Sequence, residues 1–415
     1  HYLCSINEYY IVEGGKDMGN RIYPIGIQNF EKIRKEGYVY VDKTALMYKL
    51  VKSGSYYFLS RPRRFGKSLL ISTLEAYFEA KRDLFEGLAV DALEKDWVKR
   101  PVLHLDLNIG KYDTPDSLDK ILDSSLSKWE ELYGTGVAES TLALRFAGVV
   151  ERAYEQSGER VAILIDEYDK PLLQAIGNEE LQREFCNTLK PFYGVLKTMD
   201  GCIKFALLTG VTKFGKVSVF SDLNNLDDIS MRKDYVEICG VSDQELHENL
   251  DIELHEFAET QGLSYDKLCT KLKEYYDGYH FTHNSIGIYN PFSLLNAFKY
   301  KEFGSYWFET GTPTYLVKLL KKHHYDLEQM AHEETDAQVL NSIDSESTNP
   351  IPVIYQSGYL TIKGYDERFG IYRLGFPNRE VEEGFIRFLL PFYANVNKVE
   401  SPFEVQKFVR EVETG

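Results

Sequence analysis

The sequence predicts an α/β protein built on a parallel sheet, followed by a helical region and a small module of helices and strands. Three observations lead to this fold class. Short apolar runs alternate with helix-like stretches as far as Gly240, the runs then stop, and two strand-like segments return near residue 360. Continuous apolar runs are typical of parallel strands that are buried on both faces. Strands that alternate with helices form a layered sheet with right-handed crossovers.

Five segments have the apolar character expected of the strands in this sheet. They cover residues 56–60, 102–107, 161–165, 203–209 and 235–239. Amphipathic patterns predict helices between them, most clearly over 116–133 and 140–157.

The chain after Gly240 is expected to form two further units. Helix-like patterns dominate 242–276 and continue in "NPFSLLNAFKYK" and "TPTYLVKLLKKHHYDLEQM", and the polar stretch 333–350 reads as a loop that ends this region. A helix, strands at 359–364 and 370–374 and a second helix then fit a winged-helix-like module. The predicted units are residues 1–20 (an N-terminal extension), 21–240 (the sheet domain), 241–345 (the helical domain) and 346–415 (the winged-helix-like region).

Composition restricts the classes of function. The formal net charge of −16 opposes a surface that coats nucleic acid or an anionic membrane as a whole. No apolar run approaches the roughly 20 residues that cross a bilayer, so no membrane partner is expected. The five cysteines are scattered and lack the spacing of a zinc site. A reduced, cytoplasmic protein is the expectation.

The first candidate site lies in "YYFLSRPRRFGKSLLISTLEAYFEA", residues 56–80. A phosphate-binding loop reads G-x-x-x-x-G-K-[ST], and Arg61 stands where its first glycine belongs. A strand precedes the loop and an amphipathic helix follows, and the N–H groups at such a helix start attract anions. In that case Lys67 bridges the phosphates and Ser68 holds Mg²⁺. The alternative is a basic, solvated turn.

The second candidate site is the end of the strand in "VAILIDEYDKPLL". In a Walker B element the first acid, here Asp166, holds the magnesium shell, and the next, Glu167, polarises the attacking water. An acidic loop without function is the alternative, but the two motifs have the order and spacing that an ATPase needs. A third strand ends in Thr209, which either senses a γ-phosphate or simply caps its strand.

These and further motifs resemble one family. The motifs are "IYPIGIQNFEKIRKEGYVYVDKT", "FLSRPRRFGKSLLISTLEAYFE", "ILIDEYDKPL", "LLTGVTKF", "YDGYHF", "YNPFSLLN", "YWFETGTPTYLV", "YQSGYLTI" and "LGFPNREV". Over about residues 21–410 the chain resembles the bacterial AAA-ATPase-like proteins, which usually carry a C-terminal PD-(D/E)XK nuclease-like domain. In that family "RPRRFGKS" occupies the Walker A position, so Arg61 belongs to the family's pattern. No Asp followed by Glu-x-Lys occurs in 375–415, and we expect the nuclease-like domain to be missing from this chain.

The resemblance implies an ASCE-type P-loop ATPase domain that binds ATP and Mg²⁺. Carried over by position, Ser68 and Asp166 are the metal ligands, and Lys67, Glu167 and Thr209 are the catalytic residues. The nucleotide-binding residues are Arg63, Arg64, Phe65, Gly66, Lys67, Ser68 and Leu69. Hydrolysis is expected to drive a conformational switch in a process related to nucleic acid. DNA or RNA binding through the C-terminal region and a homo-oligomer are further expectations. A non-catalytic nucleotide- or DNA-binding scaffold is the competing function.

Several other residues permit two interpretations. Arg63 and Arg64 could contact phosphates or balance nearby carboxylates. Arg232 could reach a γ-phosphate, but a surface ion pair is favoured. The aromatic cluster 274–281 is predicted to pack in a core rather than stack on bases. His280 and His283 lack further ligands, so no metal site is proposed there.

Overall fold

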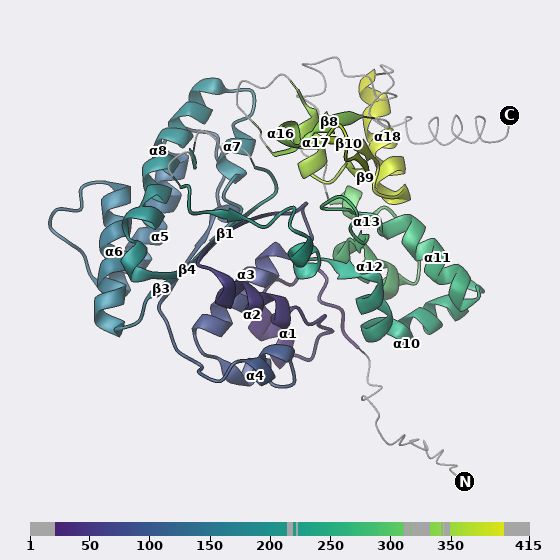
Figure 1. Ribbon diagram of the computed structural model, residues 1–415, viewed down its shortest axis with the longest axis horizontal. Coiled ribbons are helices and arrows are strands. Elements are labelled where there is room, and N and C mark those ends of the chain that lie inside the picture. The colour runs from purple at the N-terminus through teal and green to yellow at the C-terminus, as the bar shows by residue number, and fades with distance from the viewer. Residues whose placement is uncertain are drawn as a thin grey trace, which may run out of the picture.

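The computed structural model (Figure 1) describes residues 21–213, 219–220, 223–310, 316, 333–341, 343 and 349–393. Five strands of the first part form one sheet in the order β2-β3-β4-β1-β5, and all neighbouring strands are parallel. The strands are β1 Tyr56–Ser60, β2 Val102–Asp106, β3 Val161–Asp166, β4 Ile203–Gly210 and β5 Asp227–Asp228. The predicted parallel α/β sheet is thereby confirmed.

The fifth predicted strand was wrong. Residues 233–238 form the 3-10 helix η4 (Lys233–Ile238), and Asp227–Asp228 take the fifth position in the sheet. Tyr235, Val236 and Ile238 of this helix have buried side chains. A short apolar run does not distinguish a buried strand from a buried helical turn, which is why the sequence pattern misled.

Helices cover both faces of the sheet. Neighbouring side chains of β3 lie in the hydrophobic cores on opposite faces of the sheet. Leu164 belongs to the core that contains residues of α2 and α3, and Ile163 belongs to the core that contains residues of α5, α6 and α8. The helices of this part are α1 Phe30–Lys35, α2 Thr44–Ser53, α3 Lys67–Phe78, α4 Ala89–Leu93, α5 Ser117–Tyr133, α6 Leu142–Ser157, α7 Lys170–Gln174 and α8 Glu179–Thr198. Two of them, α5 and α6, confirm the helices predicted over 116–133 and 140–157.

The ends of α6 illustrate why these sequences form helices. The Thr141 side chain accepts a hydrogen bond from Leu144 N at the start, and Gly158 ends the helix with φ 70°. A threonine N-cap and a left-handed glycine are the signals by which helices begin and end. The apolar face between them places Phe146, Val149 and Ala153 in the core.

Helices also dominate the helical region, residues 241–310. A capping box between Ser242 and Glu245 starts its first helix, and a two-stranded antiparallel sheet pairs the segment before α10 with the segment before α12. The elements are β6 Val241–Ser242, α10 Asp243–Gln261, α11 Tyr265–Tyr276, β7 Ile288–Tyr289, α12 Pro291–Tyr300 and α13 Tyr306–Glu309. Most of the helix predicted in "TPTYLVKLLKKHHYDLEQM" lies outside the described residues.

Within the C-terminal unit, the described residues from 333 to 393, the part from residue 349 on has the predicted order of helix, strand, strand and helix. Its elements are β8 Glu334–Asp336, α16 Ala337–Asn341, α17 Ile351–Gln356, β9 Thr361–Asp366, β10 Ile371–Gly375 and α18 Arg379–Tyr393. β8 pairs with β10 at the edge of the sheet. Both β8 and α16 fall within 333–350, where a polar loop was predicted, so that expectation was wrong. β8 is a short and partly exposed edge strand, which carries no apolar pattern.

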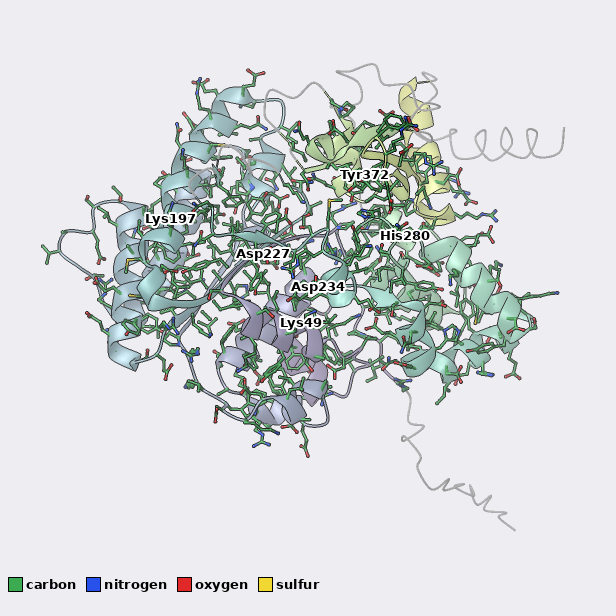
Figure 2. The ribbon with its side chains drawn as sticks, viewed as in Figure 1. Lys49, Lys197, Asp227, Asp234, His280 and Tyr372 are labelled. Carbon is green, nitrogen blue, oxygen red and sulfur yellow. The ribbon has the colours of Figure 1, made fainter. Side chains whose placement is uncertain are left out.

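The C-terminal unit packs against the helical region. His280 N of the helical region donates a hydrogen bond to Thr361 Oγ1 of β9 at 2.7 Å. Figure 2 labels His280 and, in the C-terminal unit, Tyr372.

The winged-helix assignment and the unit boundaries remain predictions. Residues 1–20, the predicted extension, and 394–415 lie outside the described residues. None of the helices in the described ranges is long and apolar enough to span a bilayer.

Candidate functional site

The predicted site residues follow three strands that end at the same edge of the sheet. β4 lies between β1 and β3, with Leu59 opposite Thr209 and Ile165 opposite Leu208. Because these strands are parallel, their carboxyl ends meet, which is where open α/β sheets bind ligands. The order of the strands thus brings together motifs that are distant in the sequence.

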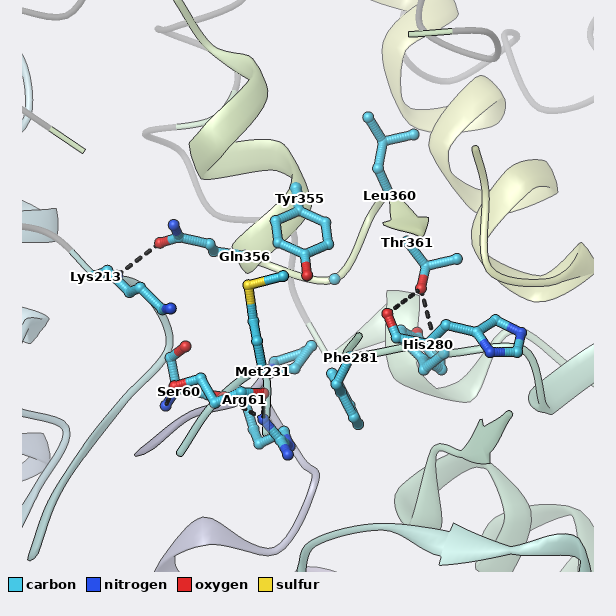
Figure 3. Close-up of a pocket in the computed structure, with 14 residues that line it drawn as sticks. Ser60, Arg61, Lys213, Met231, His280, Phe281, Tyr355, Gln356, Leu360 and Thr361 are labelled. Atoms are coloured by element: carbon cyan, nitrogen blue, oxygen red, sulfur yellow. Dashed lines mark hydrogen bonds between the residues drawn. The ribbon is translucent and has the colours of Figure 1, made fainter. Parts of the chain in front are cut away.

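Arg61, which opens the RPRRFGKS loop (residues 61–68), is a buried structural residue. Its guanidinium donates hydrogen bonds to the carbonyl oxygens of Ser60 (2.9 Å), Ser230 (2.7 Å) and Tyr235 (3.2 Å). It also lies 3.9 Å from the ring centre of Phe281, beside a cavity of about 30 Å³ (Figure 3). Burial lowers the pKa of Arg61 to about 10. Arg61 therefore joins β1 to the segments that follow β5.

Gly66 gives the loop its turn into α3. Its φ of 97° lies in the left-handed region, which glycine enters without the strain that a side chain causes. Lys67 and Ser68 are the first residues of the 12-residue helix α3. The N–H groups of a helix's first turn have no partner within the helix, so this end of α3 is suited to an anion.

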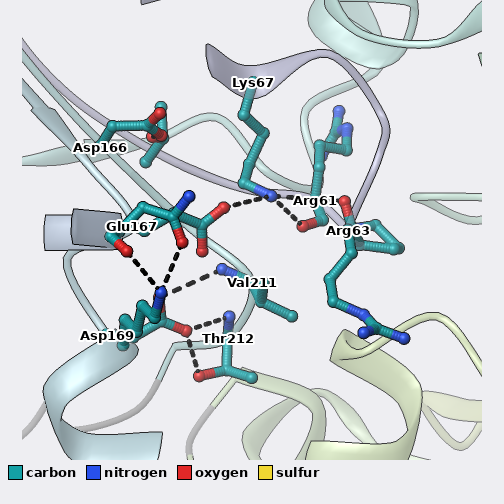
Figure 4. Close-up of polar contacts among 12 residues, drawn as sticks. Arg61, Arg63, Lys67, Asp166, Glu167, Asp169, Val211 and Thr212 are labelled. Atoms are coloured by element: carbon teal, nitrogen blue, oxygen red, sulfur yellow. Dashed lines mark hydrogen bonds and ion pairs between the residues drawn. The ribbon is translucent and has the colours of Figure 1, made fainter. Parts of the chain in front are cut away.

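Lys67 is enclosed by three acceptors. Its Nζ atom lies 3.1 Å from the carbonyl oxygen of Arg61, 3.4 Å from that of Pro62 and 3.1 Å from Glu167 Oε1 (Figure 4). An ammonium group has three N–H donors, so these contacts use all of them. The lysine is only 4% exposed. The two motifs, about a hundred residues apart in the sequence, therefore meet at these two side chains.

Glu167 has an unusual backbone conformation. Its φ is 55°, in the left-handed region that residues other than glycine seldom adopt. Such conformations cost about 1–3 kcal/mol and concentrate at functional sites, where the surrounding structure maintains them. Here the carbonyl oxygen of Glu167 accepts a hydrogen bond from Lys170 N at 3.0 Å at the start of α7.

Asp166 and Thr209 form a buried pair behind Glu167. Thr209 Oγ1 donates to Asp166 Oδ1 at 2.5 Å, and neither residue is more than 4% exposed. A carboxylate and a hydroxyl are the oxygen ligands that Mg²⁺ prefers, and the ion usually takes only one or two carboxylates from the protein. Asp166 is absent from the lining of the large cavity, whereas Ser68 lies in it, so the structure does not place the two predicted metal ligands side by side.

A cavity of about 960 Å³ opens beside this edge. Such a volume is typical of small-molecule sites. Its lining includes most of the predicted nucleotide-binding residues, namely Arg63, Arg64, Gly66, Lys67, Ser68 and Leu69, together with Glu167.

Phe65 differs from this prediction because its side chain does not line the cavity. The ring is 1% exposed and packs against Tyr279 and Phe281, with centroids 4.8 and 5.5 Å apart. Its carbonyl oxygen accepts a hydrogen bond from Gly240 N at 3.0 Å. Phe65 thus anchors the loop in the core, and the apolar ring is drawn there by burial.

Arg63 and Arg64 both lie next to aromatic rings. The Arg63 guanidinium carbon lies 5.6 Å from the ring centre of Trp307, and that of Arg64 lies 4.9 Å from the ring of Phe292. Arg63 Nη2 is buried and has no hydrogen-bond partner among the described residues. No carboxylate in the described part of the chain forms an ion pair with either arginine, which weakens the interpretation that they balance nearby acids.

Asp169 is a residue of the site that the sequence reading missed. It is completely buried and accepts hydrogen bonds from Val211 N (3.3 Å), Thr212 N (2.6 Å) and Thr212 Oγ1 (2.7 Å). Burial, together with the charge of Glu167, raises the pKa of Asp169 to about 7. The sequence signal that could have identified Asp169 is that it is the third acidic residue in "DEYD", residues 166–169. Asp169 ties the segment after Asp166-Glu167 to the segment after Thr209.

That second segment continues to Lys213, which contacts the C-terminal unit. Lys213 Nζ lies 2.8 Å from Asp228 and donates to Asn341 Oδ1 at 2.6 Å. Its backbone N–H donates to Gln356 Oε1 at 2.6 Å. The sequence offered no signal for this connection between β4 and α17.

The remaining candidates behave as structural residues. Arg232 forms surface ion pairs with Asp227 (2.6 Å) and Asp234 (2.9 Å), as favoured above. In the 274–281 cluster Tyr276 and Tyr279 are buried, in agreement with the packing interpretation. Within the described ranges no group of three His, Cys, Asp or Glu side chains is arranged to hold a metal ion.

Comparisons with known proteins show the family of the chain. A family model described as "Predicted AAA-ATPase" matches residues 24–220. An "uncharacterized protein in vnfD 5′region" of Azotobacter chroococcum mcd 1 is 40% identical over 384 residues, which cover 91% of this chain and 71% of that protein. The chain belongs to the predicted AAA-ATPase family. The family match contains the RPRRFGKS loop, Asp166-Glu167 and Thr209.

Two solved structures are weakly similar to this AAA-ATPase family member. The Walker-type ATPase PABY2304 of Pyrococcus abyssi has a TM-score of 0.35 and 12% identity, with 89% of this chain and 98% of that chain covered. The ORC2 protein of Aeropyrum pernix, in ADPNP–ADP complexes, has a TM-score of 0.31 and 12% identity, with 86% and 92% covered. Similarities at this level carry no argument about function.

Proposed function

We propose that the protein binds ATP with Mg²⁺ in the 960 Å³ cavity and hydrolyses it. One observation carries the proposal: Lys67 at the start of α3 and Glu167 at the end of β3 meet at 3.1 Å beside a helix N-terminus. A phosphate-binding lysine and a water-orienting acid are the two groups that P-loop hydrolysis places around the γ-phosphate. Membership of the predicted AAA-ATPase family supports the same class of activity.

The proposed roles follow from the positions of the side chains. Lys67 exchanges its contact with Glu167 for the β- and γ-phosphates, and the α3 N–H groups bind the same anion. Released from the lysine, Glu167 orients a water molecule for attack. Ser68 and Asp166 would hold Mg²⁺, which would supply positive charge to the phosphates. Thr209 fixes the Asp166 carboxylate through their hydrogen bond.

Arg63 and Arg64 are proposed to contact the phosphates as well. Both line the cavity, and the buried Arg63 Nη2 has no acceptor in the described part of the protein. A buried guanidinium N–H without a partner is costly, and a phosphate oxygen would satisfy it.

The test is ATP binding and phosphate release by the wild type and by the Lys67→Ala and Glu167→Gln variants. Lys67→Ala is expected to abolish binding and hydrolysis, and Glu167→Gln to abolish hydrolysis while ATP remains bound. The exposed residues Lys120 and Glu367 provide matched controls, Lys120→Ala and Glu367→Gln, which should behave like the wild type. Absence of ATP binding by the wild type with Mg²⁺ would disprove the proposal.

The wider biological setting is also proposed. We expect hydrolysis to move the helical region and the winged-helix-like C-terminal unit against the sheet, in a cytoplasmic process that involves DNA or RNA and a homo-oligomer. Cys186, Cys202, Cys239 and Cys269 carry free thiols, which suits a reducing compartment. The turnover assay with and without DNA, together with the mass of the particle in solution, tests these points.

A non-catalytic scaffold is the second candidate. The observation that favours it is that Lys67 already uses its three donors within the protein. DNA binding that is unaffected by ATP and by Lys67→Ala would support the scaffold and contradict the switch.

A further inference from the structure

Trp307 of α13 contacts the RPRRFGKS loop from the second half of the chain. Its indole Nε1 donates a hydrogen bond to the carbonyl oxygen of Arg63 at 2.9 Å, across 244 residues of sequence. The Arg63 guanidinium carbon also lies 5.6 Å from the indole ring. Trp307 is completely buried. A large, buried and hydrogen-bonded side chain holds its partner in one position.

Trp307 is in turn held by the C-terminal unit. Its backbone N–H donates to Glu380 Oε1 of α18 at 2.7 Å, and its ring packs against Tyr359 with centroids 5.2 Å apart. Thr310 lines the large cavity, and its Oγ1 atom donates a hydrogen bond to the carbonyl oxygen of Trp307 at 2.7 Å. The indole therefore lies between α18 and the loop.

Two neighbouring loop residues are also contacted from the second half of the chain. A Cβ atom on Gly358 would lie 2.6 Å from Pro62 Cβ, so the backbone after α17 passes directly against Pro62. The guanidinium of Arg61 stacks on Phe281 of the helical region, 3.9 Å from its ring centre. Residues 61–63 are thus each held by a residue that follows the sheet domain.

These contacts reach the phosphate site through Lys67. The carbonyl oxygens of Arg61 and Pro62 accept hydrogen bonds from Lys67 Nζ. A shift of the backbone at residues 61–63 therefore changes the acceptors that position the ammonium group.

We propose that Trp307 is a positioning residue for the RPRRFGKS loop, so that ATP affinity depends on the packing of α13 and α18 against it. The inference rests on the proposed ATP binding. Residues 61–63, which include the arginine at the position of the first glycine, then provide the surface through which the second half of the chain acts on the phosphate site.

The first test compares Trp307→Phe with Trp129→Phe. The phenylalanine keeps an aromatic ring but removes the N–H that Arg63 O accepts. Trp129 is a buried tryptophan of α5 that packs on Phe146, in the core on the other face of the sheet from α3, and serves as the control. Loss of one hydrogen bond should raise the Kd and the KM for ATP by about two- to tenfold, with kcat within about twofold of the wild type.

A pair of glycine variants separates local strain from contact with the loop. Gly358 has φ 89° and Gly158 has φ 70°, so alanine is strained at both, but only at Gly358 does the new Cβ meet a neighbour, Pro62. Gly358→Ala should therefore raise the KM for ATP, whereas Gly158→Ala should lower the melting temperature without changing the KM. Equal KM values for the two variants would contradict the inference.

A spectroscopic readout reports directly on the indole. The chain has three tryptophans, so Trp97→Phe with Trp129→Phe leaves Trp307 as the only one. Titration with ATP and Mg²⁺ should change the fluorescence emission of Trp307 until it saturates. The Kd from this titration should equal the Kd measured by calorimetry. If the wild type binds no ATP, the proposed function and this inference both fail. If the wild type binds ATP, but Trp307→Phe matches it and the Trp307 emission stays constant, only the inference fails.

Discussion

Lys67 Nζ and Glu167 Oε1 lie 3.1 Å apart, so the two groups proposed to act on ATP neutralise each other. The ion pair is largely shielded from water, since the lysine side chain is 3% and the glutamate side chain 18% exposed. Phosphate has to replace the carboxylate at the ammonium group. In the proposed mechanism the pair sets the order of events, because Glu167 would become available for water only after Lys67 had bound phosphate.

Glu167→Gln is expected to tighten ATP binding while it stops turnover. The neutral amide competes with phosphate for the Lys67 ammonium less well than the carboxylate does. The Kd for ATP should therefore fall by about fivefold, or ~1 kcal/mol. Turnover should fall by about 100-fold or more, as expected on loss of a general base. Calorimetric titration and phosphate release measure the two effects. Glu159→Gln, which weakens a partly buried pair with Arg100 away from the cavity, is the control. Weaker ATP binding by Glu167→Gln would count against the competition described here.

Arg61→Gly is expected to damage the protein even though it restores the strict phosphate-loop pattern. The change leaves three carbonyl oxygens without their buried donor and opens a void beside Phe281. The loss of stability should be about 2–4 kcal/mol, with no gain in ATP affinity. Urea unfolding and ATP titration check this result. A stable Arg61→Gly variant that binds ATP more tightly would show that Arg61 merely occupies a glycine position.

Thr209→Val tests the hydrogen bond to Asp166. Valine has nearly the same shape but lacks the hydroxyl that donates to Asp166 Oδ1 at 2.5 Å. Turnover should fall by about 10- to 100-fold, and the Mg²⁺ concentration for half-maximal rate should rise, while ATP binding without metal changes little. Thr209→Ser keeps the hydroxyl and should restore most of the rate. If valine and serine variants behave alike, the hydroxyl has no role.

The pair of His104 and Glu75 predicts a pH-dependent contribution to stability. Burial opposes the charged imidazole, but the hydrogen bond from Nδ1 to Glu75 Oε2 at 3.1 Å and the charge of Glu75 outweigh it and raise the pKa of His104. A pKa raised on folding stabilises the protein below the unfolded value of about 6.5, and this stability is lost as the pH rises through the folded pKa.

Glu75→Gln should accordingly lower the free energy of unfolding by about 0.5 kcal/mol at pH 5.5 and by less at pH 9. The small value allows for solvent screening, since the His104 and Glu75 side chains are 29% and 35% exposed. Urea unfolding at both pH values measures the effect. In a His104→Asn background the pH dependence of the Glu75→Gln effect should disappear, and its persistence would assign it to another group.

Much of the sheet could be predicted from the sequence because burial on both faces leaves a local pattern. β1 and β3 are continuous apolar runs, and all their residues are buried. β5 has two aspartates and no such pattern, so the nearby apolar run at 235–239 was chosen in its place. Length and composition alone do not separate a strand from a 3-10 helix there.

The meeting of Lys67 and Glu167 was predictable for a similar reason, since parallel strands that carry motifs at their ends must bring them to one edge. The contact of Trp307 with Arg63 was not, because it joins residues 244 apart through a single side chain. Asp169 was missed because its hydrogen bonds depend on how the ends of β3 and β4 are placed relative to each other. Such contacts leave no periodicity in the sequence.

The position of β1 in the sheet also affects how the chain is made. β1 pairs with β4 and β5, which begin at Ile203 and Asp227, long after Ser60 has been synthesised. At about 5–20 residues per second, the ribosome needs roughly ten to thirty seconds to deliver these partners. During that time "YYFLS" is an apolar strand with both edges unpaired, which favours association with other nascent chains. The order of the sheet therefore leaves β1 without its neighbouring strands until β4 and β5 have been synthesised.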